Sequence, residues 1–434
     1  MKGTIMDYPL TLTQFFERSR RLFPRKAILT RIPGQDPFRY TYADFADRVG
    51  RLAGVLRDLG VGSGDRVATF MWNGHQHLEA YWAVPLMGAV LHTVNFRLAP
   101  HDIAYILNHG GARVVLVGAS VWPLLQAVRP ELRHVHHLVV VRDRPDCALP
   151  EGVPEYESLL AAVTPVPAWP VLGERDAAGM CYTSGTTGHP KGVVYTHRAL
   201  YLHCLGMALP DAVAFTERDV ILHVVPMFHA NAWCVPYIGV MVGATQIFAG
   251  PSPQPADVVE LIERERVTFT SAVPTVWLGV KDVCEKEPHD LSTLRCITVG
   301  GSAAPRSLIE HFEKTLGVTI IHAWGMTEMS PLGTVSRLKR EMEAWDEPAR
   351  FEVRAKQGLP TIGVDLRVVD AEGREAPWDG TTVGEVQVRG PWIATGYYQD
   401  PEPGARLTDD GWFRTGDVGS MDPVSYTHLT LPTN

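Results

Sequence analysis

Two long runs, in which short apolar segments alternate with amphipathic helical segments, constrain the fold of this 434-residue chain most strongly. The first run extends from about residue 41 to 145, and the second from about residue 177 to 324. Apolar segments that are nearly continuous indicate strands of a parallel sheet covered by helices on both faces. The pattern therefore predicts two doubly wound, mostly parallel α/β sheets.

The pattern changes after about residue 336. Strand-like pieces now alternate with Gly, Pro and Asp turns, as in GVDLRVVDAEG and GEVQVRG. Such spacing is typical of antiparallel strands and predicts a small, β-rich, barrel-like unit. A proline-rich stretch at 163–177 indicates a boundary between the two α/β parts. The predicted domains are residues 1–170, 171–335 and 336–423, followed by a tail at 424–434.

Composition excludes several classes of protein. A net charge of −8 argues against a nucleic-acid binder, because phosphate backbones require a basic face. Six cysteines without a CxxC pair are typical of reduced thiols, so we expect a cytoplasmic protein. Residues 221–256 carry no Lys, Arg, Asp or Glu, yet His and Pro interrupt the apolar run before it could span a bilayer. We therefore expect no transmembrane segment.

A glycine-rich loop follows a strand of the second run, where residues 182–192 read YTSGTTGHPKG. Successive amide groups of small residues form an anion-binding nest, hydroxyls add donors, and Lys191 adds a cation. The loop is not the GxxxxGK[ST] type, because Lys191 follows Pro190 and precedes Gly192. It therefore predicts a phosphate site of another kind, to be weighed against a flexible surface loop without a ligand.

The order S-G-T-T-G-x-P-K-G resembles the phosphate-loop signature of the acyl-adenylate-forming superfamily. That superfamily includes acyl-CoA synthetases, firefly luciferases and peptide-synthetase adenylation domains. The resemblance implies that the loop holds the β- and γ-phosphates of ATP. The residues that it assigns to ATP binding here are Thr183, Ser184, Gly185, Thr186, Thr187, Gly188 and Lys191.

The segment HAWGMTE at 322–328 matches a second motif of that superfamily. By this resemblance Trp324 stacks on adenine, Thr327 contacts the α-phosphate and Glu328 holds Mg²⁺, with Ser184 as a further metal ligand. A carboxylate suits this role, because Mg²⁺ prefers oxygen ligands. His322, Ala323 and Gly325 are assigned to the nucleotide as well.

Two shorter motifs complete the expected nucleotide site. GGSAAP at 300–305 resembles the loop beside the adenine, which assigns Gly301, Ser302 and Ala303 to the nucleotide. TGD at 415–417 resembles the ribose-binding motif, and an ionised Asp417 can accept hydrogen bonds from both ribose hydroxyls.

PMFHANAW at 226–233 resembles the motif that flanks the carboxylate substrate. The resemblance assigns His229 to catalysis, together with Lys191, Thr327 and Glu328, and places His229, Ala230 and Gly301 beside the acyl group. Trp233 matches a tryptophan that closes the fatty-acyl tunnel in long-chain acyl-CoA synthetases. A tryptophan in an apolar stretch also packs well in a core.

The resemblance covers residues from about 10 to 423 and is greatest to medium- and long-chain fatty-acyl-CoA ligases. It implies a ligase that uses ATP, Mg²⁺ and coenzyme A, forms acyl-AMP from a fatty acid, and then makes the thioester. It also implies a homodimer. Two alternatives stay open, namely a ligase for another carboxylate, such as a thioether or aryl acid, and a non-catalytic module that binds nucleotide or acyl-adenylate.

The family pattern stops after GWFRTGDVGSMDP, since VSYTHLTLPTN resembles no further part of it. We therefore expect residues 424–434 to be a foreign tail, and the C-terminal α+β domain of the family to be missing. That domain supplies a lysine and a CoA surface in the family, so we expect the chain as given to be impaired or inactive.

Overall fold

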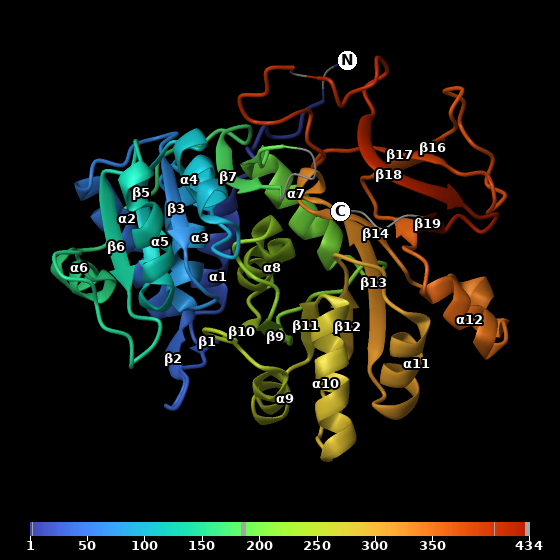
Figure 1. Cartoon of the computed structure of the whole chain (residues 1–434), viewed down its shortest axis with the longest axis horizontal. Coiled ribbons are helices and arrows are strands. Elements are labelled where there is room, and N and C mark those ends of the chain that lie inside the picture. The colour runs from blue at the N-terminus through green and yellow to red at the C-terminus, as the bar shows by residue number, and fades with distance from the viewer. Residues whose placement is uncertain (2, 184–187, 403, 430–434) are drawn as a thin grey trace.

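The computed structural model describes residues 1, 3–183, 188–402 and 404–429. Figure 1 shows two helix-covered sheets side by side and a smaller sheet beside the second of them. This is the mixed α/β architecture that the alternation of segments predicts. Ser184, Gly185, Thr186 and Thr187, which the loop motif assigns to phosphate, lie outside the described residues.

The first sheet has six strands in the order β6-β5-β3-β4-β7-β8. Its strands are parallel except for the antiparallel pair of β7 and β8. Their bounds are β3 Arg66–Phe70, β4 Val90–Thr93, β5 Ala112–Gly118, β6 His137–Val141, β7 Ala177–Tyr182 and β8 Gly192–Thr196.

The second sheet has nine strands in the order β15-β14-β13-β12-β11-β9-β10-β1-β2. It is parallel in the middle and antiparallel at both edges. Its strands are β1 Ala27–Thr30, β2 Phe38–Thr41, β9 Val220–His223, β10 Thr245–Phe248, β11 Phe269–Ala272, β12 Cys296–Val299, β13 Thr319–Gly325, β14 Leu332–Val335 and β15 Leu359–Pro360.

Helices cover both sheets, and the largest core cluster contains residues from strands of both. The α-helices are α1 Leu12–Leu22, α2 Tyr42–Asp58, α3 His75–Leu86, α4 Pro100–His109, α5 Trp122–Val128, α6 Tyr156–Ala162, α7 His197–Ala208, α8 Val235–Val242, α9 Pro255–Arg264, α10 Pro274–Lys286, α11 Arg306–Thr315 and α12 Glu347–Arg354. The 3₁₀ helices are η1 Ala119–Val121, η2 Arg129–Glu131, η3 Ala230–Cys234, η4 Thr327–Met329 and η5 Arg340–Ala344.

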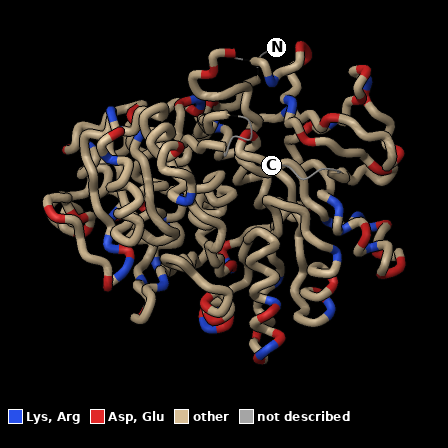
Figure 2. The backbone as a smooth tube through the Cα atoms, in the orientation of Figure 1, with Lys and Arg blue, Asp and Glu red and all other residues tan. Residues whose placement is uncertain are grey.

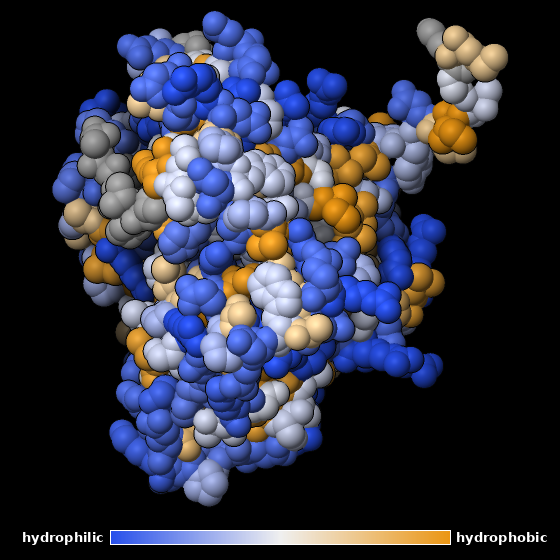
Figure 3. All heavy atoms as spheres, turned by 90° about the vertical axis from the view of Figure 1, so that its right-hand side faces the viewer, coloured by the Kyte–Doolittle hydropathy of each residue, from blue (hydrophilic) through white to orange (hydrophobic). Residues whose placement is uncertain are grey.

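The β-rich unit is an antiparallel sheet of four strands in the order β16-β17-β18-β19. Its strands are β16 Asp365–Val369, β17 Gly384–Arg389, β18 Phe413–Met421 and β19 Thr427–Leu429. On the face that Figure 3 shows, hydrophobic side chains lie among hydrophilic ones, without one continuous apolar surface.

The beginning of the expected foreign tail packs against the rest of the fold, while its foreign origin stays a prediction. Residues 427–429 form β19 and pair with β18. Tyr426 is fully buried, and its hydroxyl donates to the carbonyl oxygen of Arg337. A large aromatic ring can be buried favourably when its hydroxyl finds a hydrogen-bond partner. The sequence motifs gave no sign of this packing.

The start of α2 shows how local sequence signals act in this chain. Thr41 caps α2, its side chain accepts from the amide of Asp44, and the Asp44 carboxylate accepts from the amide of Thr41. This reciprocal pair is a capping box, which satisfies two amide groups at the helix start. The apolar stripe that follows is buried, as the periodicity predicts.

Some strands belong to a different sheet from the one that their position in the sequence suggests. β1 and β2 come first in the chain but belong to the second sheet, through the pairing of β1 with β10. β7 and β8 follow the proline-rich stretch but belong to the first sheet, through the pairing of β7 with β4. Each of these two sheets therefore contains strands from both sides of residue 170. The expected domain boundary near that residue stays a prediction.

Figure 2 shows Lys and Arg interspersed with Asp and Glu along the described backbone. Within the described residues, no helix is both long enough and apolar enough to cross a membrane.

Candidate nucleotide and acyl site

The end of β13 lies against the small sheet through a direct side-chain contact. Trp324 is the second-last residue of β13, and Asp417 lies in β18, 93 residues further along the chain. The indole Nε1 of Trp324 donates to Oδ2 of Asp417 at 2.8 Å. The structure thus brings together the two residues that the sequence assigned to adenine and to ribose.

Asp417 carries a carboxyl group that is hard to ionise in this position. Burial raises its pKa to about 6, the hydrogen bond from Trp324 lowers it, and the negative charge of Glu328 raises it. The charge of Glu328 thus affects the ionisation of Asp417. A bound cation or a network of hydroxyl donors would favour their charged forms.

Glu328 lies in η4, directly after β13, and is 4% exposed. Burial raises the pKa of its carboxyl group, whereas a hydrogen bond from Tyr397 lowers it. The hydroxyl of Tyr397 donates to Oε1 of Glu328 at 2.6 Å. A carboxylate offers oxygen ligands, which are the type that a hard divalent cation prefers.

The described part of the phosphate loop reaches the same place. The strands on either side of the loop, β7 and β8, pair antiparallel, and the amide of Thr183 donates to the carbonyl oxygen of Lys191 at 2.9 Å. Nζ of Lys191 lies 4.9 Å from the centroid of the Tyr397 ring. Lys191 and Glu328, which the sequence placed in one site, thus contact the same tyrosine.

An irregular segment after β17 joins these parts through its backbone. The amide of Ala394 donates to the carbonyl oxygen of Glu328 at 2.7 Å, and the amide of Tyr398 donates to that of Gly192 at 2.7 Å. Sequence reasoning missed Tyr397, because a tyrosine in a segment without periodicity carries no signal of its partner. It also missed Tyr195, whose buried hydroxyl donates to the carbonyl oxygen of Thr327 at 2.8 Å.

His322 supports the glycine loop that was assigned to the adenine side. Its Nε2 accepts from the amide of Ala304 at 3.3 Å, and its Nδ1 donates to the carbonyl oxygen of Ala355 at 3.0 Å. Burial lowers the pKa of His322 to about 4, so the ring is neutral at pH 7. The exposed residues Gly301, Ser302 and Ala303 lie just before Ala304.

The acyl motif meets this loop through Trp233. A β-carbon added to Gly300 would lie 3.3 Å from Cη2 of Trp233 and 3.0 Å from the carbonyl oxygen of Ala323. The indole therefore packs directly on the backbone at Gly300, where a side chain would crowd it. Gly300 was not assigned a role from the sequence.

The backbone that carries Trp233 has an unusual conformation. Ala230 to Cys234 all have positive φ angles, from 42° to 60°. Left-handed backbone costs L-residues about 1–2 kcal/mol each, so the surrounding packing must hold this turn. Asn231 is fully buried, and Cys234 donates to the carbonyl oxygen of Ser330 at 3.0 Å.

His229 immediately precedes this turn. It remains exposed to solvent, although surrounding protein atoms desolvate the imidazole and lower its pKa. A neutral imidazole keeps one N–H group, which can donate a hydrogen bond to a carboxylate. The structure thus leaves His229 accessible beside the half-buried Trp233.

Comparison with known proteins agrees with this arrangement. The family model described as AMP-binding enzyme matches residues 16–398. The chain belongs to the AMP-binding enzyme family. A long-chain-fatty-acid–CoA ligase of Thermus thermophilus is 50% identical over 429 residues, which cover 98% of this chain and 78% of that ligase. A 3-methylmercaptopropionyl-CoA ligase of Ruegeria pomeroyi is 40% identical, with 98% and 79% covered.

Solved structures of AMP-binding enzymes share the fold. An inhibitor-bound N-terminal domain of FACL13 from Mycobacterium tuberculosis superposes with a TM-score of 0.83 at 28% identity, covering 98% of this chain and 100% of that one. An anthranilate CoA ligase in complex with anthranoyl-AMP gives a TM-score of 0.86 at 23% identity, and the match covers 99% of this chain and 79% of that one.

The AMP-binding family and these relatives place the chain among the acid–CoA ligases that form AMP. The substrates of that class are a carboxylic acid, ATP and coenzyme A. The predicted family and enzyme class are therefore confirmed. The roles of the individual site residues stay predictions.

Proposed function

We propose that the chain carries the site of a ligase that activates a medium- or long-chain fatty acid with ATP and transfers the acyl group to coenzyme A. The convergence of Lys191, Glu328, Trp324 and Asp417 on one place carries this proposal. Lys191 lies just before β8 of the first sheet, and Trp324 lies in β13 of the second sheet. Glu328 lies in η4 after β13, and Asp417 lies in β18 of the small sheet. A packing role alone would not require two acidic groups and a lysine to meet there.

The reaction has two group transfers. A carboxylate oxygen of the fatty acid attacks the α-phosphorus of ATP, the bond to the β-phosphate oxygen breaks, and pyrophosphate leaves. The sulfur of CoA then attacks the acyl carbonyl carbon, and AMP leaves with the bonding electron pair. Catalysis in such a site consists of positioning and electrostatic stabilisation, without a covalent enzyme intermediate.

The proposed roles are those that the family resemblance assigns, and the contacts of several of these groups support them. Trp324 presents its indole to the base and fixes the Asp417 carboxylate, which accepts from the ribose hydroxyls. Lys191 offsets negative charge on the phosphates, and Thr327 lies next to Glu328 for the α-phosphate. Glu328 fits Mg²⁺, which would neutralise charge on the leaving pyrophosphate. His229 and Ala230 lie at the carboxylate end of the acyl group.

The acyl chain class rests on the surroundings of Trp233. α8 follows Trp233 directly, and its residues from Val235 to Met241 are buried and almost entirely apolar. Contact with such an apolar segment would favour an aliphatic tail, at about 0.8 kcal/mol per buried methylene group. The 50% identity with the Thermus long-chain ligase supports the same class. The 40% identity with a 3-methylmercaptopropionyl-CoA ligase favours a short thioether acid as the second candidate.

Pyrophosphate release with a series of acids tests the choice between them. We expect octanoate to palmitate to support faster release at limiting concentration than 3-methylthiopropionate or benzoate. The reverse order would establish the thioether or aryl alternative. Release with none of the acids, together with binding of acyl-AMP, would favour the non-catalytic module.

Trp233→Ala tests the proposed acyl gate. Removing the indole opens the space beside Gly300, so we expect the ratio of kcat/KM for dodecanoate over butyrate to rise about tenfold, the value of one or two methylene contacts. Pyrophosphate release with each acid measures it. Trp378→Ala is the matched control, because Trp378 is 47% exposed. An equal loss for every acid would show that Trp233 only supports the fold.

A further inference from the structure

Tyr397 lies between the lysine of the phosphate loop and the buried acid of the second motif. Its hydroxyl donates to Oε1 of Glu328 at 2.6 Å, and its ring lies 4.9 Å from Nζ of Lys191. Within the described part of the chain, the Tyr397 side chain contacts both Glu328 and Lys191. Neither the loop motif nor the acid motif includes it.

The backbone on both sides of Tyr397 is fixed to the same two motifs. Ala394 donates to the carbonyl oxygen of Glu328, and Tyr398 donates to that of Gly192, the residue after Lys191. The backbone that carries the ring is therefore anchored on both sides. Neither anchor involves the Glu328 side chain.

The contact leaves the acid able to bind a cation. An ionised carboxylate has two oxygens with about four lone-pair sites, and the Tyr397 hydroxyl uses one of them. A phenol is protonated at neutral pH, so it donates and does not add a competing charge. A short hydrogen bond from a neutral donor to a carboxylate is strong and directional, and thus restricts how the carboxylate can rotate.

We propose that Tyr397 is a positioning residue of the nucleotide site, holding the Glu328 carboxylate in the orientation that binds a divalent cation and holding Lys191 beside it. This inference rests on the proposed function and adds a residue to it. Tyr397 acts through Glu328 and Lys191, without contact with the reacting atoms.

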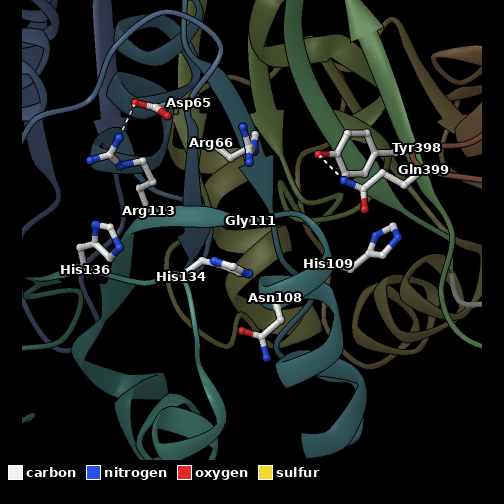
Figure 4. Close-up of a pocket in the computed structure, with 10 residues that line it drawn as sticks. All are labelled: Asp65, Arg66, Asn108, His109, Gly111, Arg113, His134, His136, Tyr398 and Gln399. Carbon is white, nitrogen blue, oxygen red and sulfur yellow. Dashed lines mark hydrogen bonds and ion pairs between the residues drawn. The ribbon is translucent and has the colours of Figure 1, made fainter.

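The neighbouring tyrosine offers a matched control. Tyr398 lines a separate pocket of about 420 Å³, together with Arg66, His109 and His134 (Figure 4). Its hydroxyl accepts from Nε2 of Gln399 at 3.2 Å, away from Glu328. Tyr398→Phe therefore removes a hydroxyl one residue away without changing the Glu328 contact.

The experiment is a calorimetric titration of the 434-residue chain with a non-hydrolysable ATP analogue at a series of Mg²⁺ concentrations. For Tyr397→Phe we expect the half-saturating Mg²⁺ concentration to rise about tenfold, since one hydrogen bond to a charged group is lost. At saturating Mg²⁺ the affinity for the analogue should return to the wild-type value. Tyr398→Phe should match the wild type throughout.

A second variant separates the two contacts. Tyr397→Leu also removes the ring beneath Lys191, so its affinity should stay reduced at saturating Mg²⁺. The same Mg²⁺ dependence in Tyr397→Phe and wild type would overturn the positioning role. A loss of affinity that saturating Mg²⁺ does not restore in Tyr397→Phe would also overturn it, because such a loss indicates scaffolding. If the wild type binds the analogue independently of Mg²⁺, the proposed function itself fails, and the role of Tyr397 fails with it.

Discussion

Asp417→Asn is expected to stabilise the folded chain at pH 7 while weakening the binding of adenosine nucleotides. Burial raises the pKa of Asp417 from 3.8 to about 6, so the ionised carboxylate is unfavourable in the fold. Asn is neutral and keeps an oxygen that can accept the hydrogen bond from Trp324. A shift of this size corresponds to at most about 3 kcal/mol, which partial solvent access reduces to about 1–2 kcal/mol.

The pH dependence of this gain has a definite sign. The pKa of Asp417 is higher in the folded than in the unfolded chain, so the folded chain binds more protons between about pH 4 and 6. The free energy of unfolding of the wild type should therefore fall, relative to Asp417→Asn, as pH rises through this window. Urea unfolding of both proteins at several pH values between 4 and 8 measures the difference, which should be small at pH 4 and constant above about pH 7.

Nucleotide binding should change in the opposite direction. An ionised Asp417 that accepts from two ribose hydroxyls makes charge-assisted bonds, and losing them should weaken AMP binding roughly 10- to 100-fold. Asp409→Asn is the control, because Asp409 is exposed and close in sequence. Unchanged AMP affinity would contradict the ribose role. Lower stability of Asp417→Asn at pH 7 would contradict the cost assigned to the buried charge.

Glu328→Gln should nearly remove the dependence of ATP binding on Mg²⁺. Gln has the same shape as Glu and keeps an oxygen that can accept from Tyr397, so we expect no change in the fold. It lacks the charge that a hard cation requires. We expect pyrophosphate release in the presence of dodecanoate to fall on the order of 100-fold, the scale for losing one preorganised electrostatic contact.

Glu352→Gln is the matched control for this variant. The Glu352 side chain is 65% exposed and pairs with Arg306, away from the nucleotide site. Calorimetry with and without Mg²⁺, together with pyrophosphate assays, should show the loss in Glu328→Gln only. Wild-type Mg²⁺ dependence in Glu328→Gln would remove this residue from the metal site.

Local features of the fold were predictable because their causes lie within a few residues. The alternation of apolar and amphipathic segments depends on short-range periodicity, and the cap of α2 needs only Thr41 and Asp44. The pairing of β1 with β10 joins residues more than 200 positions apart. No local pattern specifies such a pairing, so the membership of β1 in the second sheet needed the structure.

The candidate site shows the same division. The motifs allowed Trp324, Glu328, Lys191 and Asp417 to be assigned from the sequence, and the structure brings them together. Tyr397 was not predicted, because its role depends on contacts with two distant motifs. The left-handed turn from Ala230 to Cys234 was not predicted either, since it contains no glycine and positive φ is uncommon for other residues.

The central claim is that one site in this chain binds the nucleotide and the acyl tail together. Calorimetric titration with a non-hydrolysable analogue of dodecanoyl-AMP, alongside AMP and dodecanoate alone, tests it most directly. We predict one analogue per chain, bound at least about 100-fold more tightly than AMP, because the buried methylene groups add to the nucleotide contacts. An analogue that binds no more tightly than AMP would contradict the account.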